Sequence, residues 1–560
     1  MTNRSIKPDR MKKVLRKNKW VWLLFVPLAI GGISFKAAED YFEISKNLEI
    51  FTGLYKELNI FYVDETNPGE LMKTGIDAML KSLDPYTVYY PESKIEDYRF
   101  MTTGQYGGIG ALVNTIDGEV TIMEPYEGYA AHSAGLLAGD VVLEIDGKDL
   151  NEVDPDEISG LLKGQAGTTV DVKIRREGEA SPMVVQVERQ DVQIPDVPYA
   201  GMLTDKVGYI HLRSFTKTAS AEVRKNLVEL RDNEGMEQLV FDLRGNGGGL
   251  LREAINIVNL FVQKGTEIVS TKGKLEEWNR THTALNEPIA PDMPVIVLVD
   301  GGSASASEIV SGALQDLDRA VVVGNTTFGK GLVQQTKDLE YNSKLKLTVA
   351  KYYIPSGRCI QKLDYTNRAG ERVDEVPDSL IKPFQTVGGR TVYDGRGVAP
   401  DVDVEQGEFS NVLAGLMRNH IVFKYATTFV RENAEIAEPE AFDLGERYDD
   451  FVAYALLKEF DYDTRTEELL ARLKEVAQDE RYYEGAEEVF ASLEEQIAPE
   501  KSRDLQKFRE QIEYTLEEEI ISRYYYQKGA IRYALEHDPV LKRALNVFGE
   551  EYIRILNGTE

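Results

Sequence analysis

Residues 299–312, VDGGSASASEIVSG, contain four serines but no histidine or cysteine. The apolar run MPVIVLVD precedes this stretch and the amphipathic pattern SEIVSGALQDL follows it, so its flanks are not those of a flexible linker. A strand, a turn of small residues and a helix together expose a serine at a helix N-terminus, where free N–H groups stabilise an oxyanion. A nucleophilic serine also needs a base, which must come from elsewhere in the chain.

A purely structural role for the same serine stays open. Ser305 and Glu308 match the S-x-x-E capping box, in which the serine only begins a helix. The stretch is not the G-x-S-x-G elbow of other serine hydrolases, because no glycine stands two positions after Ser303 or Ser305.

Two residues are candidates for the base. His211 lies in the strand-like segment GYIHLRSF, without a local signature that supports a Ser–His pair. Lys330 lies between two glycines in GNTTFGKGLVQQ. A lysine accepts a proton near neutral pH only when burial lowers its pKa from about 10.4. An ordinary surface lysine is the alternative.

Glycine-rich motifs near these residues also allow phosphate chemistry. GNTTFGKG satisfies the first seven positions of a P-loop, but Gly331 occupies the position of the Ser or Thr that ligates magnesium, and no helix pattern follows. A nucleotide-hydrolysing enzyme is therefore disfavoured. The glycines of FDLRGNGGG can supply an oxyanion-binding amide or cradle phosphate, or they only allow close strand–helix packing.

The surrounding pattern predicts several domains, as the length of 560 residues also does. Between about residues 191 and 417 apolar strands alternate with helices, which indicates an α/β core. Residues 101–190 read as short strands with glycine turns, whereas residues 41–99 and the charged region beyond 425 read as helical. One helix is expected over Glu70–Leu83.

Charge and cysteine content exclude some classes of function. The formal net charge of −29 argues against nucleic-acid binding by the folded part, and the single Cys359 excludes intramolecular disulfides and cysteine-based zinc sites. The first nineteen residues are basic and residues 20–35 are apolar, which indicates an export signal or, preferably, an uncleaved membrane anchor. A buried core helix is the alternative.

These motifs together resemble the carboxyl-terminal processing peptidases, or tail-specific proteases. The resemblance rests on SASASEIVSGALQDLDRAVVVGNTTFGKGLVQQ, supported by LKSLDPYTVYY, LVFDLRGNGGG, PSGRCIQ and GRGVAPDVDV, and it runs from about residue 45 to 405. It implies an α/β fold, a crotonase- and Clp-protease-like spiral of ββα units. It also implies that Ser305 is the nucleophile, Lys330 the general base and Gln334 the residue that orients the lysine. The oxyanion hole would be formed by the amides of Ala306 and of Gly247 or Gly248.

The β-rich insert resembles a PDZ domain. YGGIGALV would supply the carboxylate-binding loop, Gly108-Ile109-Gly110, and SAGLLAGDVVLEIDGKDL is typical of such domains. A C-terminal tail would add to the sheet edge as an extra strand. A PDZ-like spacer that binds nothing is the alternative. Lys163 stands where relatives often have an arginine thought to link PDZ occupancy to the active site, so this coupling is in doubt.

The resemblance thus predicts an exported, ATP-independent serine endopeptidase of the bacterial cell envelope, with no cofactor and no metal. Its partners would be protein C-terminal tails and, through residues 20–35, the inner membrane; an adaptor protein and homo-oligomerisation stay open. A catalytically silent peptide-binding scaffold is the alternative from another class. The expected domains are the basic and apolar N-terminus (1–36), a helical region (37–100), the PDZ domain (101–190), the peptidase core (191–425) and a helical C-terminal domain (426–560). The resemblance gives no role to the insertion at 363–389 or to the C-terminal domain.

Overall fold

The computed structural model describes residues 41–559, except for 154, 366–372, 406 and 408. The predicted signal or anchor, residues 20–35, lies outside the described residues. The chain divides into two compact units, residues 1–89 and 90–560. Within the described segments, no helix is both long enough and apolar enough to cross a membrane.

The first unit contains a helix over residues 41–61 and α3 (Pro68–Lys81). The prediction of a helix here is confirmed, but α3 begins two residues earlier than expected. It starts there because Pro68 suits the first helical position and the Asn67 side chain accepts the N–H groups of Gly69 and Glu70.

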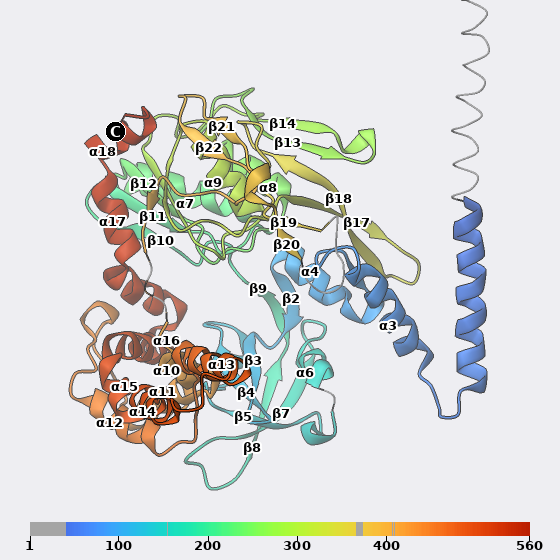
Figure 1. Ribbon diagram of the computed structural model, residues 1–560, viewed down its shortest axis with the longest axis vertical. Coiled ribbons are helices and arrows are strands. Elements are labelled where there is room, and N and C mark those ends of the chain that lie inside the picture. Colours follow the sequence, from blue (N-terminus) through green and yellow to red (C-terminus); the bar gives the residue numbers. More distant parts are fainter. Residues whose placement is uncertain (1–40, 154, 366–372, 406, 408, 560) are drawn as a thin grey trace, which may run out of the picture. The chain divides into compact units, whose positions relative to one another are not determined.

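The second unit is built around a six-stranded sheet of order β10-β11-β12-β15-β16-β23 (Figure 1). Its strands are β10 (Tyr199–Met202), β11 (Val207–His211), β12 (Gln238–Asp242), β15 (Val295–Val299), β16 (Val321–Gly324) and β23 (Val402–Asp403). All neighbours are parallel except β10 and β11. Parallel strands buried on both faces read as continuous apolar runs, as in VIVLV of β15.

Helices cover both faces of this sheet. One face packs on α7 (Ala219–Asn233), α8 (Leu251–Val258) and α9 (Ala306–Asp316). The other face packs on α17 (Pro539–Val547) and α18 (Glu550–Leu556), which come from the end of the chain. The apolar side chains of Val540 and Leu541 lie in one buried cluster with those of Val240, Ile296 and Leu298. The last helices of the chain therefore complete the core of the sheet from which the turn to Ser305 leaves.

A second, antiparallel sheet adjoins this core. It includes β13 (Glu267–Gly273), β14 (Arg280–Thr283), β17 (Leu332–Asp338) and β18 (Lys344–Tyr353). Strands β17 and β18 form a long hairpin. The insertion after this hairpin contains short strands, among them β21 (Pro383–Gln385) and β22 (Thr391–Tyr393).

Residues 105–193 form the β-rich region that the glycine turns predicted. A sheet of order β3-β4-β5-β7-β8 contains β3 (Ala111–Ile116), β4 (Glu119–Pro125), β5 (Val141–Ile145), β7 (Thr169–Arg175) and β8 (Met183–Glu188). Strand β2 (Gln105–Gly108) pairs with β9 (Gln190–Gln193), and α5 (Ala130–Ser133) and α6 (Pro155–Leu162) complete the region. Strand β3 lies at the edge of its sheet, with β4 on one side only.

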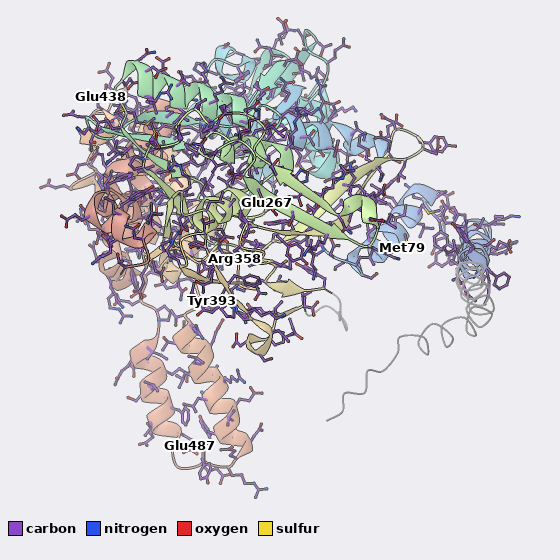
Figure 2. The ribbon with its side chains drawn as sticks, turned by 90° about the horizontal axis from the view of Figure 1, so that it is seen from above. Met79, Glu267, Arg358, Tyr393, Glu438 and Glu487 are labelled. Atoms are coloured by element: carbon purple, nitrogen blue, oxygen red, sulfur yellow. The ribbon has the colours of Figure 1, made fainter. Side chains whose placement is uncertain are left out.

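The predicted helical region near the C-terminus is present. Its helices are α10 (Asn411–Arg418), α11 (Ile421–Glu432), α12 (Arg447–Leu456), α13 (Arg465–Asp479), α14 (Glu487–Ile497), α15 (Lys501–Lys507) and α16 (Arg509–His537). Figure 2 shows α13 and α14 as a two-helix hairpin, with Glu487 near its tip. Helix α16 is broken at Tyr526, whose φ of 55° and ψ of −164° are not helical.

Candidate active site

Ser305 is placed at the start of a buried helix, as the strand–turn–helix pattern predicted. It is the N-cap of α9, which follows β15 after a short turn. The Asp300 carboxylate holds this turn by accepting the N–H groups of Gly302 and Ser303 at 2.9 and 3.0 Å. Ser305 has a φ of 56°, a backbone conformation that residues other than glycine rarely adopt. Strain of this kind persists only where surrounding contacts fix it, and it is concentrated at functional sites.

The opposite end of α9 is also fixed. Arg358, labelled in Figure 2, is almost completely buried and donates to the Gln315 side chain at 2.7 Å. Its guanidinium also lies 2.9 Å from the Asp316 carboxylate, at the last residue of the helix. The helix that begins at the predicted nucleophile, Ser305, is therefore anchored at both ends.

Glu308 connects the turn that ends at Ser305 to the loop that contains Lys330. Its completely buried carboxylate accepts the N–H of Ser305 at 2.8 Å, as in the predicted capping box. The same carboxylate accepts the N–H groups of Gly329 and Lys330 at 2.7 and 2.8 Å and the Thr327 hydroxyl at 2.6 Å. Burial raises the pKa of Glu308, and these hydrogen bonds oppose the rise.

Tyr352 of β18 makes a second connection between the two segments. Its hydroxyl lies within donating distance of two carbonyl oxygens, that of Ser305 at 3.0 Å and that of Lys330 at 2.8 Å. The main chains of both predicted catalytic residues are thus held by the same two side chains, Glu308 and Tyr352. The sequence indicated Glu308 only as a helix cap and gave no indication of Tyr352.

Lys330 and Gln334 lie on the connection into the β17–β18 hairpin. Lys330 is partly buried between the buried residues Gly329 and Gly331, two residues before β17 begins. Because a strand rather than a helix follows, the structural context of a P-loop is absent. Gln334 lies on β17, and its Nε2 donates across the hairpin to Thr348 Oγ1 at 3.4 Å. The role of Gln334 in orienting the lysine stays a prediction.

The other candidate base, His211, is the last residue of β11. Burial lowers its pKa, and the charge of Asp242 opposes this effect. Within the described part of the chain no hydrogen bond joins His211 to Ser305. The geometry therefore gives no support to a Ser–His pair.

Of the two glycines predicted for the oxyanion hole, Gly248 lies directly against Ser305. A β-carbon on Gly248 would come within 2.7 Å of the Ala304 carbonyl oxygen and 2.9 Å of both the Ala306 nitrogen and the Ser305 β-carbon. Gly248 also has a φ of 97°. Only glycine fits this position, because the obstructing atoms belong mostly to backbone.

The amide groups of these residues differ in availability. The N–H of Gly248 donates to Asn246 Oδ1 at 2.9 Å, so it is already engaged. The N–H groups of Ala306 and Gly247 have no acceptor among the described residues. An amide at the first turn of a helix is not used within that helix, as expected for Ala306.

The predicted carboxylate loop lies between β2 and β3. Gly108 ends β2, Ile109 is buried, and Gly110 has a φ of 73°. A β-carbon on Gly110 would meet the Tyr129 β-carbon at 2.5 Å. The loop leads directly into the free edge of β3, to which a peptide strand can add.

Lys163 connects the β-rich region to the helix before it. Its ammonium lies 2.8 Å from the Asp97 carboxylate of α4 (Ile95–Thr103), and its main chain forms a bridge with Gly108. The lysine therefore lies next to the predicted carboxylate loop.

Comparison with known proteins agrees with these features. Residues 206–367 match the model of peptidase family S41, residues 121–176 that of a PDZ domain, and residues 412–548 that of a C-terminal helical domain of probable PDZ-proteases. A carboxy-terminal-processing protease of Bartonella bacilliformis is 36% identical over 57% of this chain and 74% of its own length.

Two further similarities were found. A probable CtpA-like serine protease of Staphylococcus aureus is 36% identical over 56% of this chain and 62% of its own length. A solved photosystem II D1 C-terminal processing protease shares 27% identity over 63% of this chain and 92% of that chain, with a TM-score of 0.34. The chain therefore belongs to peptidase family S41, as a carboxy-terminal-processing serine protease with a PDZ domain, an α/β core and a helical C-terminal domain.

Proposed function

We propose that this protease cleaves peptide bonds with a Ser305–Lys330 dyad, without ATP or a cofactor. The observation that carries the proposal is the Glu308 carboxylate, which binds the N–H groups of both residues. One buried side chain thereby fixes the nucleophile turn and the lysine loop relative to each other. A pair that exchanges a proton needs a fixed relative position of this kind.

In this mechanism the Ser305 hydroxyl attacks the scissile carbonyl while neutral Lys330 accepts its proton. The amides of Ala306 and Gly247 stabilise the oxyanion, because the Gly248 amide is engaged by Asn246. Lys330 then protonates the leaving amine, and a water molecule hydrolyses the acyl-enzyme in the reverse sense.

The dyad can be tested by mapping the cleavage products of a protein with an apolar tail by mass spectrometry. Ser305→Ala should reduce kcat by about a thousandfold or more. Ser311→Ala is the matched control, since Ser311 is a buried serine of the same helix whose hydroxyl only donates to Ser307 O. Equal cleavage by Ser305→Ala and wild type would exclude the dyad.

Lys330→Arg gives a sharper test of the base. Arginine keeps the positive charge but does not lose its proton at accessible pH. Lys337→Arg, on the exposed part of β17, is the control. Loss of activity in Lys330→Arg with unchanged activity in Lys337→Arg would assign proton transfer to Lys330. If all variants and wild type are equally inactive on every substrate, the silent scaffold is the correct function instead.

We further propose that the PDZ domain selects substrates by their C-terminal tails. The tail would pair with β3, and the amides of Gly108, Ile109 and Gly110 would bind its terminal carboxylate. The free edge of β3, which begins directly after that loop, supports this assignment. A substrate with an amidated tail should bind about tenfold more weakly than one with a free carboxylate; equal binding would indicate a spacer domain.

We also propose that the protease acts in the bacterial cell envelope, held there by residues 20–35. The basic segment followed by an apolar run supports export, and the similar proteins with printed organisms are bacterial. Fractionation of cells that express the full chain or a chain from residue 37 tests the anchor. Equal recovery of both in the soluble fraction would exclude it. An adaptor and self-association stay predictions.

A further inference from the structure

The segment that follows β11 lies directly behind the glycine loop of the nucleophile. Phe215 is completely buried, and its N–H donates to Gly248 O at 3.2 Å. Its carbonyl accepts the N–H of Leu250 at 2.8 Å. The carbonyl of Leu212 accepts from Asn246 Nδ2 at 2.7 Å. Residues 212–215 therefore form one wall of the loop that contains Gly247 and Gly248.

Arg213 anchors this segment. Its N–H donates to Asp196 O at 2.8 Å, and one guanidinium nitrogen donates to Pro195 O at 2.8 Å. Residues 195 and 196 belong to the connection between β9 and β10, that is, between the PDZ domain and the core. The second guanidinium nitrogen donates to Gln527 Oε1 at 3.2 Å.

Gln527 connects Arg213 to the C-terminal helices and to the PDZ domain. It follows Tyr526, the residue at which α16 breaks. Its side chain also interacts with the Glu124 carboxylate of β4, where it lowers the pKa of that carboxyl against the larger rise caused by burial. One glutamine amide thus contacts an arginine of the core and a glutamate of the PDZ domain.

The break in α16 places Gln527 at this contact. A second contact to the PDZ domain fixes the break itself. The Tyr526 hydroxyl lies 2.8 Å from His132 Nε2, and the N–H of Gly128 donates to His132 Nδ1 at 3.2 Å. Around these contacts the PDZ domain and the helices are incompletely packed, because a cavity of about 240 Å³ is lined by residues of both, Leu136 and Val430 among them. The few polar contacts at the break are therefore important for the placement of Gln527.

Glu124 lies next to the expected tail site. It is the β4 partner of Leu112, which lies on the free edge strand β3. A peptide added to β3 would therefore lie one strand away from the Glu124–Gln527–Arg213 contacts.

We propose that Arg213 is a positioning residue for the oxyanion loop, and that Gln527 makes its position depend on the PDZ domain and the C-terminal helices. The proposal rests on Ser305 being the nucleophile and on the adjacent loop binding the oxyanion. Arg213 does not touch the reacting atoms. Its hydrogen bonds fix residues 212–215 in place. These residues bond to the loop of Gly248, and Gly248 packs on Ser305.

Kinetics on a tail-bearing protein and on the same protein without its tail test the proposal in the full-length enzyme. Arg213→Ala should lower kcat on both substrates by about tenfold to a hundredfold, less than the loss of an oxyanion donor itself. The affinity of a fluorescent apolar tail peptide, measured in a Ser305→Ala background, should change by less than about twofold. A kcat within twofold of wild type would overturn the proposal.

Gln527→Leu tests the connection without removing the arginine. It should lower kcat about threefold to tenfold and reduce the preference for the tail-bearing substrate. Gln496→Leu is the matched control, since Gln496 lies on the exposed hairpin helix α14, bonded only to Ser492 at 3.4 Å. Gln527→Leu behaving like Gln496→Leu would contradict the role of Gln527.

Two outcomes separate this proposal from the proposed function. Full activity of Ser305→Ala would refute the dyad itself. An inactive Ser305→Ala together with wild-type kinetics of Arg213→Ala and Gln527→Leu would refute only the positioning role. If Arg213→Ala lowers both the melting temperature and the tail affinity, the milder variants Arg213→Lys and Gln527→Leu test the positioning role instead. A lower kcat with unchanged tail affinity in these variants supports that role. An unchanged kcat contradicts it.

Discussion

Two glycine turns of this protease present main-chain amides, but they are constrained in different ways. The turn at Gly248 is enclosed mostly by backbone, since an added β-carbon would collide with Ala304 O and Ala306 N. The turn at Gly110 is enclosed by a side chain, that of Tyr129. Backbone atoms of a buried helix start move little, so the peptidase turn is rigid. The obstructing Tyr129 atom is a β-carbon, and the Tyr129 hydroxyl donates to Gln193 O at 2.7 Å, so the PDZ turn is also closed to a side chain. The two turns differ in what they lie against: the peptidase turn packs on Ser305, and the PDZ turn packs on a tyrosine of its own domain.

The largest effect is expected at the rigid turn. Gly248→Ala should reduce kcat by about a hundredfold or more, because the new β-carbon must displace Ser305 or the Ala306 amide. Gly247→Ala is the comparison variant, because no atom lies within 4 Å of its added β-carbon. Steady-state kinetics on a tail-less protein measure both. Equal losses in the two variants would contradict the rigid-turn interpretation.

A smaller loss is expected when the connection between the two catalytic segments is weakened. Each Glu308 oxygen accepts two donors, so both oxygens must be unprotonated. In Glu308→Gln an NH₂ group replaces one of these oxygens, so the two donors that this oxygen accepted meet another donor, and kcat should fall by about tenfold to a hundredfold. A loss of less than threefold would show that the connection is dispensable.

The same carboxyl predicts opposite pH trends for activity and stability. Its pKa is raised above the ordinary value of 4.5, so activity should begin to fall on acidification at a higher pH than an ordinary glutamate would give. Its contribution to the unfolding free energy has the opposite sign: it is greatest below 4.5 and is lost as the pH rises through the raised pKa. Urea unfolding of wild type and Glu308→Gln across this range measures the second trend. Parallel pH curves for the two proteins would contradict it.

A moderate effect is expected at the Gly110 turn. Gly110→Ala should weaken tail binding by about tenfold, since its φ of 73° and the nearby Tyr129 must both adjust. Activity on a tail-less protein should stay within about twofold of wild type. Fluorescence anisotropy with a tail peptide measures the binding. A loss of activity equal to that of Gly248→Ala would remove the distinction between the turns.

The smallest effect is expected at Lys163. Its ion pair with Asp97 is substantially exposed, so Lys163→Met should change the unfolding free energy by less than about 1 kcal/mol. Thermal unfolding measures this change, with Lys148→Met as a control on the exposed strand β6 (Lys148–Asp149). If Lys163→Met loses tail-stimulated activity while its unfolding free energy changes by less than this amount, Lys163 has a coupling role.

Local sequence signals predicted the parts of the site that depend on local structure. The apolar run of β15 and the S-x-x-E pattern placed Ser305 at the start of a helix. The contacts of Tyr352 and Arg213 were not predictable in this way. They join residues far apart in the chain, and neither residue stands in a distinctive pattern.

Two features of the fold also escaped prediction. The apolar faces of α17 and α18 indicated helices, but amphipathic spacing does not show which sheet a helix will cover. The break of α16 at Tyr526 falls within YYYQK, which contains no proline or glycine. Its cause is tertiary, since the residues at the break bind His132 and Arg213.

The open edge of β3 has a consequence for how this protein behaves in concentrated solution. An unpaired strand edge that is open to a substrate tail is also open to a strand from any other chain, which is a route to aggregation. The formal net charge of −29 keeps copies apart by repulsion, and salt screens that repulsion over about 8 Å at physiological ionic strength. If β3 binds tails as proposed, the same strand ties substrate capture to colloidal stability, and saturating the enzyme with a tail peptide should keep it dispersed at high salt.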